Sequence, residues 1–157
     1  MINLIVACGK NRVIGRNGKL PWAIKEDWEY FLEKTTGGVL IMGRNCFSEF
    51  ESYAQGREVI VLTRNPELDF KHAQAAHSLQ SALLKAQKLN KTIWICGGER
   101  IYEEAMPLAN LLYITQIDRC FEGDAFFPEW EKVFRREIFR KEIKAGDLTL
   151  QFLVYEK

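Results

Sequence analysis

The sequence predicts an α/β protein with a mainly parallel sheet, helices on both faces and an antiparallel hairpin at its C-terminal end. Short apolar runs rich in β-branched residues lie at 2–8, 39–42, 59–62, 93–96 and 111–117, and each has the length of a buried strand. Helical patterns separate these runs, and such alternation is typical of a parallel sheet. Two further runs, at 133–142 and 148–155, flank Ala145-Gly146-Asp147 and predict the hairpin.

Four segments have the features of helices. The first begins at about Lys25, after a loop in which Gly15 and the pair Asn17-Gly18 supply backbone freedom. Short helices are expected at 45–50 and 99–105, each after a strand that runs into glycine. Ser78 is a favourable N-cap for the remaining helix, whose apolar residues at 79, 82, 83 and 86 share one face.

Length and composition indicate one globular domain that covers residues 1–157. Hydrophobic residues make up 47% of the chain, which is enough for a core. Basic residues are scattered and the formal net charge is +1, so we expect neither a nucleic-acid surface nor a membrane surface. No apolar run reaches the length of a membrane span, and residues 1–4 enter a strand pattern rather than a signal peptide, so we expect a cytoplasmic protein.

The cysteines, at positions 8, 46, 96 and 120, form no CxxC pair, and the chain has only two histidines. Structural zinc is usually held by closely spaced ligand pairs, so we expect no metal site. A nucleophilic cysteine is one interpretation of these residues. Buried, reduced cysteines are the other, and they are the usual form in a cytosolic protein.

Asp27 is the acid whose position suggests chemistry. It lies three residues after Ile24 and four before Phe31, so helical spacing places its carboxylate on the apolar face of the first helix. A carboxylate on such a face is unfavourable unless a cation or a hydrogen-bonding group meets it. The alternative interpretation is structural, because acids are common in the first turn of a helix, where they complement the macrodipole.

Three strand ends combine turn or glycine residues with arginine: Gly43-Arg44, Thr63-Arg64 and Gly97-Gly98-Glu99-Arg100. Free N–H groups after a glycine turn suit a phosphate, and arginine adds bidentate recognition. Three such ends on one edge of a sheet suggest a dinucleotide, although neither G-x-G-x-x-G nor G-x-x-x-x-G-K-[ST] is present. Arg57 is a further candidate, for a carboxylate, and a solvated surface arginine is its alternative interpretation.

Taken together, the short motifs of the chain resemble those of bacterial dihydrofolate reductases in order and spacing over essentially the whole length. They are Ile14-Gly15, Leu20-Pro21-Trp22, Asp27 with Phe31, Ile41-Met42-Gly43-Arg44, Gly56-Arg57, Gly97-Gly98 with Ile101-Tyr102, Tyr113-Ile114-Thr115, and Glu122-Gly123-Asp124 before Phe127-Pro128. The resemblance implies the single-domain fold of that family. This fold has an eight-stranded, mostly parallel sheet, a C-terminal antiparallel hairpin and about four flanking helices.

The resemblance also implies a substrate site for dihydrofolate. Asp27 would bind the 2-amino group and adjacent ring nitrogen of the pterin, and Thr115 would support it. Arg57 would hold the α-carboxylate of the glutamate tail. The full set implied for the substrate is Ile5, Val6, Asp27, Trp28, Phe31, Phe50, Arg57, Cys96 and Thr115, and the implied catalytic set is Asp27, Trp22, Tyr102 and Thr115.

The cofactor implied by the resemblance is NADPH, with Arg44, Thr63 and Arg64 at its 2′-phosphate. Residues 15–20 would form a lid over the nicotinamide, and Asp124 would hold the lid backbone. The implied cofactor residues are Ala7, Ile14, Gly15, Asn17, Gly18, Leu20, Gly43, Arg44, Asn45, Cys46, Leu62, Thr63, Arg64, Cys96, Gly97, Gly98, Glu99, Arg100, Ile101 and Tyr102. Gly97-Gly98 matches a pair that is joined in the family by a cis peptide.

The predicted activity is therefore reduction of 7,8-dihydrofolate to 5,6,7,8-tetrahydrofolate with NADPH, by a monomer that also binds antifolate inhibitors. Two alternatives are a pyrimidine reductase of flavin biosynthesis on the same fold and a non-catalytic folate- or nucleotide-binding module. Asp27 and Arg57 argue against the first, and the retained acid and glycine pair argue against the second. Trp28, Cys46, Cys96 and the segment Ser52-Tyr53-Ala54-Gln55 depart from the usual family pattern, which suggests resistance to diaminopyrimidine inhibitors.

Overall fold

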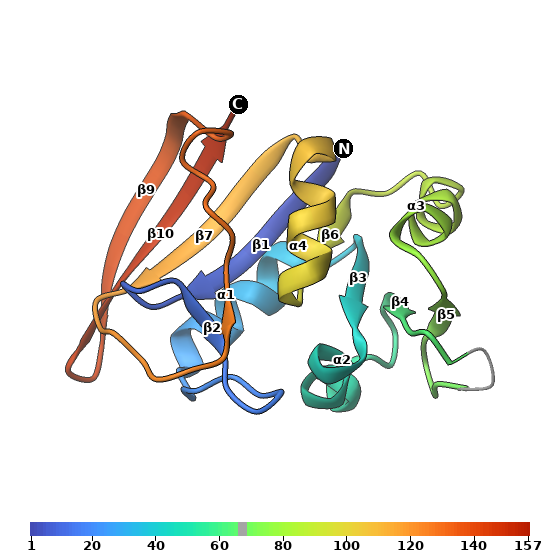
Figure 1. The fold of residues 1–157 in the computed structure, drawn as a ribbon, viewed down its shortest axis with the longest axis horizontal. Coiled ribbons are helices and arrows are strands. Elements are labelled where there is room, and N and C mark those ends of the chain that lie inside the picture. The colour runs from blue at the N-terminus through green and yellow to red at the C-terminus, as the bar shows by residue number, and fades with distance from the viewer. Residues whose placement is uncertain (66–68) are drawn as a thin grey trace.

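An eight-stranded sheet forms the centre of the computed structural model, which describes residues 1–65 and 69–157 (Figure 1). Its strand order is β5-β4-β3-β6-β1-β7-β10-β9. The strands are β1 (Ile2–Cys8), β3 (Val39–Gly43), β4 (Glu58–Leu62), β5 (Gln74–Ala76), β6 (Ile93–Ile95), β7 (Leu111–Ile117), β9 (Arg136–Ala145) and β10 (Leu148–Glu156). All pairs from β5 to β7 are parallel, and β10 is antiparallel to both β7 and β9. The predicted fold class, including the closing hairpin, is confirmed.

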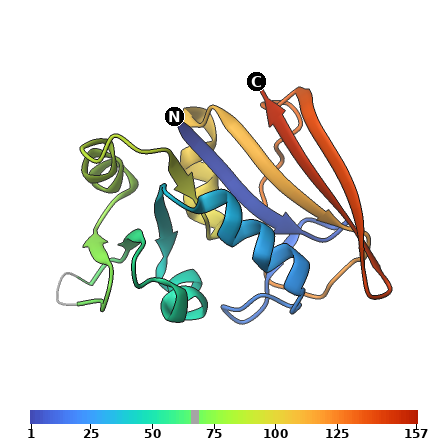
Figure 2. The ribbon, with the colours of Figure 1, turned by 180° about the vertical axis from the view of Figure 1, so that it is seen from behind.

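Two helices cover each face of the sheet. Helices α1 (Lys25–Thr35) and α2 (Arg44–Phe50) pack against one side of β3, β4 and β6. Helices α3 (Leu79–Gln87) and α4 (Glu99–Ala105) pack with the other side of β1, β3 and β6. Figure 1 shows α4 in front of the sheet, and Figure 2 shows α1 in front when the molecule is seen from behind. No helix in the described part of the chain is long and apolar enough to cross a membrane.

Local sequence accounts for how these helices begin and end. Ser78 caps α3, because its side chain accepts a hydrogen bond from the Ser81 N–H, as predicted. Helices α2 and α4 begin directly after Gly43 and Gly98 and continue into the 3₁₀ turns η1 (Glu51–Tyr53) and η2 (Met106–Leu108). Both helices therefore start at the carboxyl edge of the sheet.

A second, two-stranded sheet pairs β2 (Val13–Gly15) with β8 (Ala125–Phe126). The sequence analysis did not predict it, because strands of three and two residues are too short to show a period. The pairing matters for the site, since it brings the segment after β2 beside Asp124. Beyond β2, Arg16 and Lys19 pair as an isolated bridge around Asn17-Gly18.

The C-terminal hairpin corrects both predicted boundaries of its first strand. Strand β9 begins at Arg136 rather than at residue 133, because the N–H groups of Val133 and Phe134 both bond to the Trp130 carbonyl in a turn. Ala145 belongs to β9, so the hairpin turn is Gly146-Asp147 alone. Phe134 is buried in the core although it lies in a loop, which explains why its apolar side chain resembled the start of a strand.

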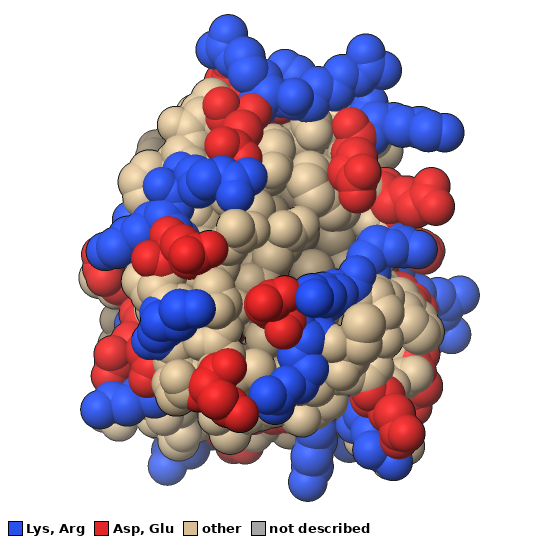
Figure 3. Space-filling model, turned by 90° about the vertical axis from the view of Figure 1, so that its left-hand side faces the viewer, with Lys and Arg blue, Asp and Glu red and all other residues tan. Residues whose placement is uncertain are grey.

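Strand β9 is an exposed edge strand, with only its last residue, Ala145, buried. Acidic and basic side chains are interspersed on the side of the molecule that it forms with β10 (Figure 3). Charged residues on an edge strand disfavour pairing with another sheet. The apolar core lies instead under the parallel strands, where the cavity also lies.

Candidate active site

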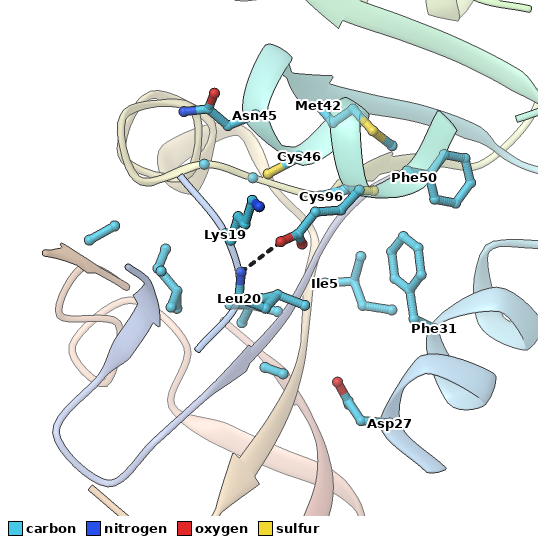
Figure 4. A pocket seen from close by; sticks show the side chains of 18 of the residues that line it. Ile5, Lys19, Leu20, Asp27, Phe31, Met42, Asn45, Cys46, Phe50 and Cys96 are labelled. Carbon is cyan, nitrogen blue, oxygen red and sulfur yellow. Dashed lines mark hydrogen bonds between the residues drawn. The ribbon is translucent and has the colours of Figure 1, made fainter. Parts of the chain in front are cut away.

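A cavity of about 200 Å³ opens at the carboxyl ends of β1, β3, β6 and β7 (Figure 4). This is the edge where ligands bind in open parallel sheets. Most of the predicted site residues line it: Ile5, Val6, Ala7, Ile14, Gly15, Gly18, Leu20, Asp27, Trp28, Phe31, Asn45, Cys46, Phe50, Cys96, Gly97, Gly98, Tyr102 and Thr115. The structure therefore brings most of the implied substrate residues and about half of the implied cofactor residues to one cavity.

Asp27 projects from the first turn of α1 into this cavity (Figure 4). Burial raises the pKa of its carboxyl group to about 6, and interaction with the Thr115 hydroxyl offsets part of the rise. No described lysine, arginine or histidine forms an ion pair with it. A helix-start acid turned to solvent would keep an ordinary pKa, so the structure favours the ligand-facing interpretation.

Thr115 reaches the cavity from the middle of the sheet. It lies on β7, opposite Ala7 of β1 on one side and Phe152 of β10 on the other, and it is buried. Because both neighbouring strands fix its backbone, its hydroxyl has a defined position at the cavity wall. A buried hydroxyl needs a hydrogen-bonding partner, and the Asp27 carboxyl group supplies one.

Four aromatic rings form the wall between α1 and α2. The Trp28 ring lies 5.4 Å from Phe31, 6.3 Å from Phe50 and 5.2 Å from Tyr53, centroid to centroid. Phe31 also meets Phe50 edge to face at 5.8 Å. The indole Nε1 of Trp28 is buried and has no hydrogen-bond partner among the described residues. This wall offers an apolar aromatic surface to a ring-shaped ligand.

Arg57 lies outside the cavity, at the end of α1. Its guanidinium donates to the Thr35 hydroxyl at 3.2 Å and to the Leu32 carbonyl at 3.3 Å. It also stacks over the Phe50 ring, 5.9 Å from the centroid. All of these partners are uncharged, so the positive charge of the guanidinium is fixed in place but not neutralised by them. This geometry suits a carboxylate at the mouth of the cavity.

The ends of β3 and β6 form a glycine surface. The peptide between Gly97 and Gly98 is cis, as the resemblance implied, and the Gly43 N–H donates to the Gly97 carbonyl at 2.8 Å. A side chain at Gly97 would meet Cys46 Sγ at 3.1 Å and the Tyr102 ring at 3.3 Å, whereas the space beside Gly98 is open. A flat ligand can therefore approach the backbone here, which fits a nicotinamide.

Tyr102 fixes one side of the same surface. Its hydroxyl donates to the Ile5 carbonyl at 2.6 Å, and burial raises the pKa of its phenol well above the usual value. Burial likewise raises the pKa of the Cys46 thiol to about 11 and that of Cys96 well above the usual range. Neutral thiols are poor nucleophiles, so the structure favours the interpretation of these cysteines as reduced and unreactive. Cys8 is buried as expected, whereas Cys46 and Cys96 are half-buried and Cys120 is exposed.

The remaining predicted residues do not line the cavity. They are Trp22, Asn17, Gly43, Arg44, Arg57, Leu62, Thr63, Arg64, Glu99, Arg100 and Ile101. Arg44, Arg64 and Arg100 are exposed and have no ion-pair partner within the described residues. The Trp22 Nε1 is buried without a partner there, and its ring packs on Phe121 at 4.8 Å.

Five residues that line the cavity were not among the predicted set: Lys19, Tyr30, Met42, Glu49 and Ala125. Met42 could have been found, since it ends the apolar run at 39–42 beside Gly43. The others carry no sequence signal, because a surface lysine, tyrosine or glutamate has the same pattern when it lines a cavity. Across the part of the chain that the structure describes, no group of three or more His, Cys, Asp or Glu residues could hold a metal ion.

The segment predicted as a lid lies at the open side of the cavity. The Asn17 N–H donates to both carboxylate oxygens of Asp124 at 3.2 Å, and the Asp124 N–H donates to the Gly15 carbonyl at 3.0 Å. The expected contact between Asp124 and the lid backbone is confirmed. It is a consequence of β2–β8 pairing, which places Gly15 opposite Ala125.

Fold and cavity together define an α/β protein with a ligand-sized cavity at the carboxyl edge of its sheet, lined by the buried carboxyl group of Asp27 and by the Gly97-Gly98 backbone. The family model for dihydrofolate reductase matches residues 1–157. The chain belongs to the dihydrofolate reductase family.

Curated relatives and a solved structure agree with this family. The chain is 36% identical to a dihydrofolate reductase of Staphylococcus haemolyticus, over 99% of this chain and 95% of the relative. It is 34% identical to that of Bacillus subtilis, over 100% and 95% of the two chains. A structure of the Enterococcus faecalis enzyme complexed with NADP(H) and RAB-propyl superposes with a TM-score of 0.90 at 31% identity, covering 99% and 95%.

Proposed function

We propose that this protein reduces 7,8-dihydrofolate to 5,6,7,8-tetrahydrofolate with NADPH. The observation that carries the proposal is Asp27, a carboxyl group of raised pKa that faces the same cavity as the Gly97-Gly98 backbone. An acid without a charged partner binds a ligand that presents several N–H donors, and the pterin ring does so. The adjacent glycine surface admits the nicotinamide ring of the cofactor.

On the substrate side, Asp27 accepts hydrogen bonds from the 2-amino group and the adjacent ring nitrogen, and Thr115 orients its carboxyl group. Ile5 and Val6 form the floor of the pocket, and Cys96 borders it. Phe31, Trp28 and Phe50 hold the pterin and aminobenzoyl rings between α1 and α2. Arg57 binds the glutamate carboxylate outside the cavity, where its guanidinium is already fixed by Thr35 and Leu32.

On the cofactor side, Ala7, Ile14, Gly97 and Gly98 bind the nicotinamide, and Tyr102 keeps that surface rigid through its bond to Ile5. Gly43, Asn45, Cys46 and the start of α4 bind the diphosphate, with Arg44, Thr63 and Arg64 at the 2′-phosphate. When bound, NADPH supplies the hydride that reduces C6 of the pterin. The protein aligns the two rings and excludes water from between them.

Asp27 also polarises the pterin for protonation at N5. Its carboxyl group binds the far side of the ring in this pose, so water delivers the proton to N5. Because burial raises the pKa of Asp27 to about 6, its carboxyl group still carries a proton at and below that pH, and this proton is available to the network of pterin and water. Trp22 has a free indole N–H that can hold such a water.

We further propose that residues 1–157 form one domain and act as a cytoplasmic monomer. Interspersed charge on the exposed edge strand β9 disfavours sheet-to-sheet association there. Antifolates that carry a diaminopyrimidine ring would bind at Asp27, because they present the same pair of N–H donors as the pterin.

The test is oxidation of NADPH, followed by absorbance, with dihydrofolate as substrate and Asp27→Asn as the control. We expect rapid dihydrofolate-dependent oxidation by the parent and a large loss in the variant. Oxidation with a pyrimidine substrate of flavin biosynthesis but not with dihydrofolate would select the related reductase. Tight binding of dihydrofolate without any oxidation would select a binding module.

A further inference from the structure

A second carboxylate, Glu49, lines the cavity opposite α1. It lies in the last turn of α2 and is half-buried. Its Oε1 accepts a hydrogen bond from the backbone N–H of Leu20 at 2.8 Å, across 29 residues of chain (Figure 4). Asp27 faces the interior of the cavity, whereas the Glu49 carboxylate is bonded to the segment that covers it.

A second contact shows that this segment follows the axis of α2. A side chain added at Gly18 would meet the Asn45 side-chain amide at 3.2 Å. Asn45 and Glu49 are four residues apart, so they lie about 6 Å apart along the helix. Gly18 therefore lies beside Asn45 in the first turn of α2, and Leu20 lies beside Glu49 in its last turn.

The other side of the same segment is held from β8. Asp124 bonds to the N–H of Asn17 and to the carbonyl of Gly15. Within the segment, the backbones of Arg16 and Lys19 bond to each other around the turn, and the Arg16 side chain forms an exposed ion pair with Glu122 at 3.5 Å. Residues 15–20 are thus held at both ends by carboxylates, Asp124 at the start and Glu49 at the end.

We propose that Glu49 is a positioning residue for the reaction, which fixes the lid over the cavity through the Leu20 N–H. The inference rests on the proposed function. Asp124 holds the start of the lid through Asn17 and Gly15, while Glu49 holds its end through Leu20. Because α2 carries both Asn45 and Phe50, the Glu49 contact places the lid against the helix that borders both ligands.

Hydrogen exchange at the Leu20 amide, measured by NMR on the full chain without ligands, tests the contact. We expect Glu49→Ala to accelerate exchange at Leu20 about tenfold or more, because a hydrogen bond to a charged acceptor is lost. Glu49→Gln retains an acceptor oxygen and should restore most of the protection. Glu51→Ala is the matched control, since Glu51 is exposed in the next turn of the same helical segment.

Single-turnover oxidation of NADPH by dihydrofolate tests the consequence. We expect Glu49→Ala to slow the hydride step several-fold with little change in dihydrofolate KM, and Glu49→Gln to recover the rate. Unchanged exchange at Leu20 in Glu49→Ala would overturn the proposal, as would equal acceleration at Leu40 and Ile41 of β3, which would indicate general loosening. If the exchange responds as expected but no variant oxidises NADPH, the contact stands and the proposed function fails.

Discussion

Helices α1 and α2 face the same cavity from the same side of the sheet, and each contributes one carboxylate to it. On α1, Asp27 has no charged partner and its pKa is raised by burial. On α2, Glu49 is bonded to the lid backbone. The chemical group is the same, so its surroundings decide its role: Asp27 is available to a ligand, and Glu49 is occupied by the protein.

The largest effect is expected from removing the charge on α1. Asp27→Asn should lower kcat/KM for dihydrofolate by about 10²-fold or more, because the variant can neither bind the pterin with a carboxylate nor polarise it by protonation. Glu26→Gln changes the neighbouring acid in the same helical turn and should leave kcat/KM near the parent value. A loss of less than threefold in Asp27→Asn would remove Asp27 from the mechanism.

The same substitution, Asp27→Asn, should increase the stability of the fold although it lowers activity. The folded protein holds the Asp27 proton to about pH 6, whereas the unfolded chain releases it near its ordinary value of 3.8. Between these values the folded state binds more protons, so stability falls as pH rises through this window and stays lower above it. Asp27→Asn removes the titrating group and with it this loss of stability. The free energy of unfolding of the variant should therefore exceed that of the parent by up to about 3 kcal/mol at pH 7.5 and by little at pH 4.

Urea unfolding of the parent and Asp27→Asn at these two pH values measures the difference. An Asp27→Asn variant that is less stable than the parent at pH 7.5 would contradict the unfavourable burial of the Asp27 charge.

A smaller effect is expected where the two helices touch. Trp28→Leu removes the ring that contacts Phe31, Phe50 and Tyr53, and should lower stability by about 2 kcal/mol. The smaller side chain also enlarges the space beside Asp27. A diaminopyrimidine should therefore bind the variant about tenfold more tightly than the parent and inhibit it at a correspondingly lower concentration. Leu84→Ala, exposed on α3, is the control. Equal inhibition of both proteins would exclude Trp28 as the cause of any resistance.

The features of the fold and site that could be predicted from the sequence are those that depend on a local pattern of residues. The strand at 2–8, the helix face that carries Asp27 and the glycine pair at 97–98 each follow from spacing or composition within a few residues. The predicted hairpin was misplaced by three residues at its start because Val133 and Phe134 are apolar loop residues.

The role of Glu49 could not be predicted in this way. A glutamate near the end of a short helix has the pattern of a solvated residue, and its partner is a backbone N–H 29 residues away. The β2–β8 pairing that supports the lid is similarly invisible, because it joins three residues to two. Both contacts involve backbone atoms that only the tertiary fold brings together, so no pattern of side chains along the sequence indicates them.

The central claim is that Asp27 interacts with the ligand while Glu49 holds the lid. The pH profile of single-turnover hydride transfer tests this claim most directly. In the parent, the rate should be highest below the pKa of Asp27, near 6, and fall about tenfold per pH unit above it. Glu49→Ala should keep this inflection at a lower maximum rate, because the pKa of Asp27 is set by burial and Thr115. Asp27→Asn should lose the inflection. A flat profile in the parent, or an inflection that disappears in Glu49→Ala, would contradict the account.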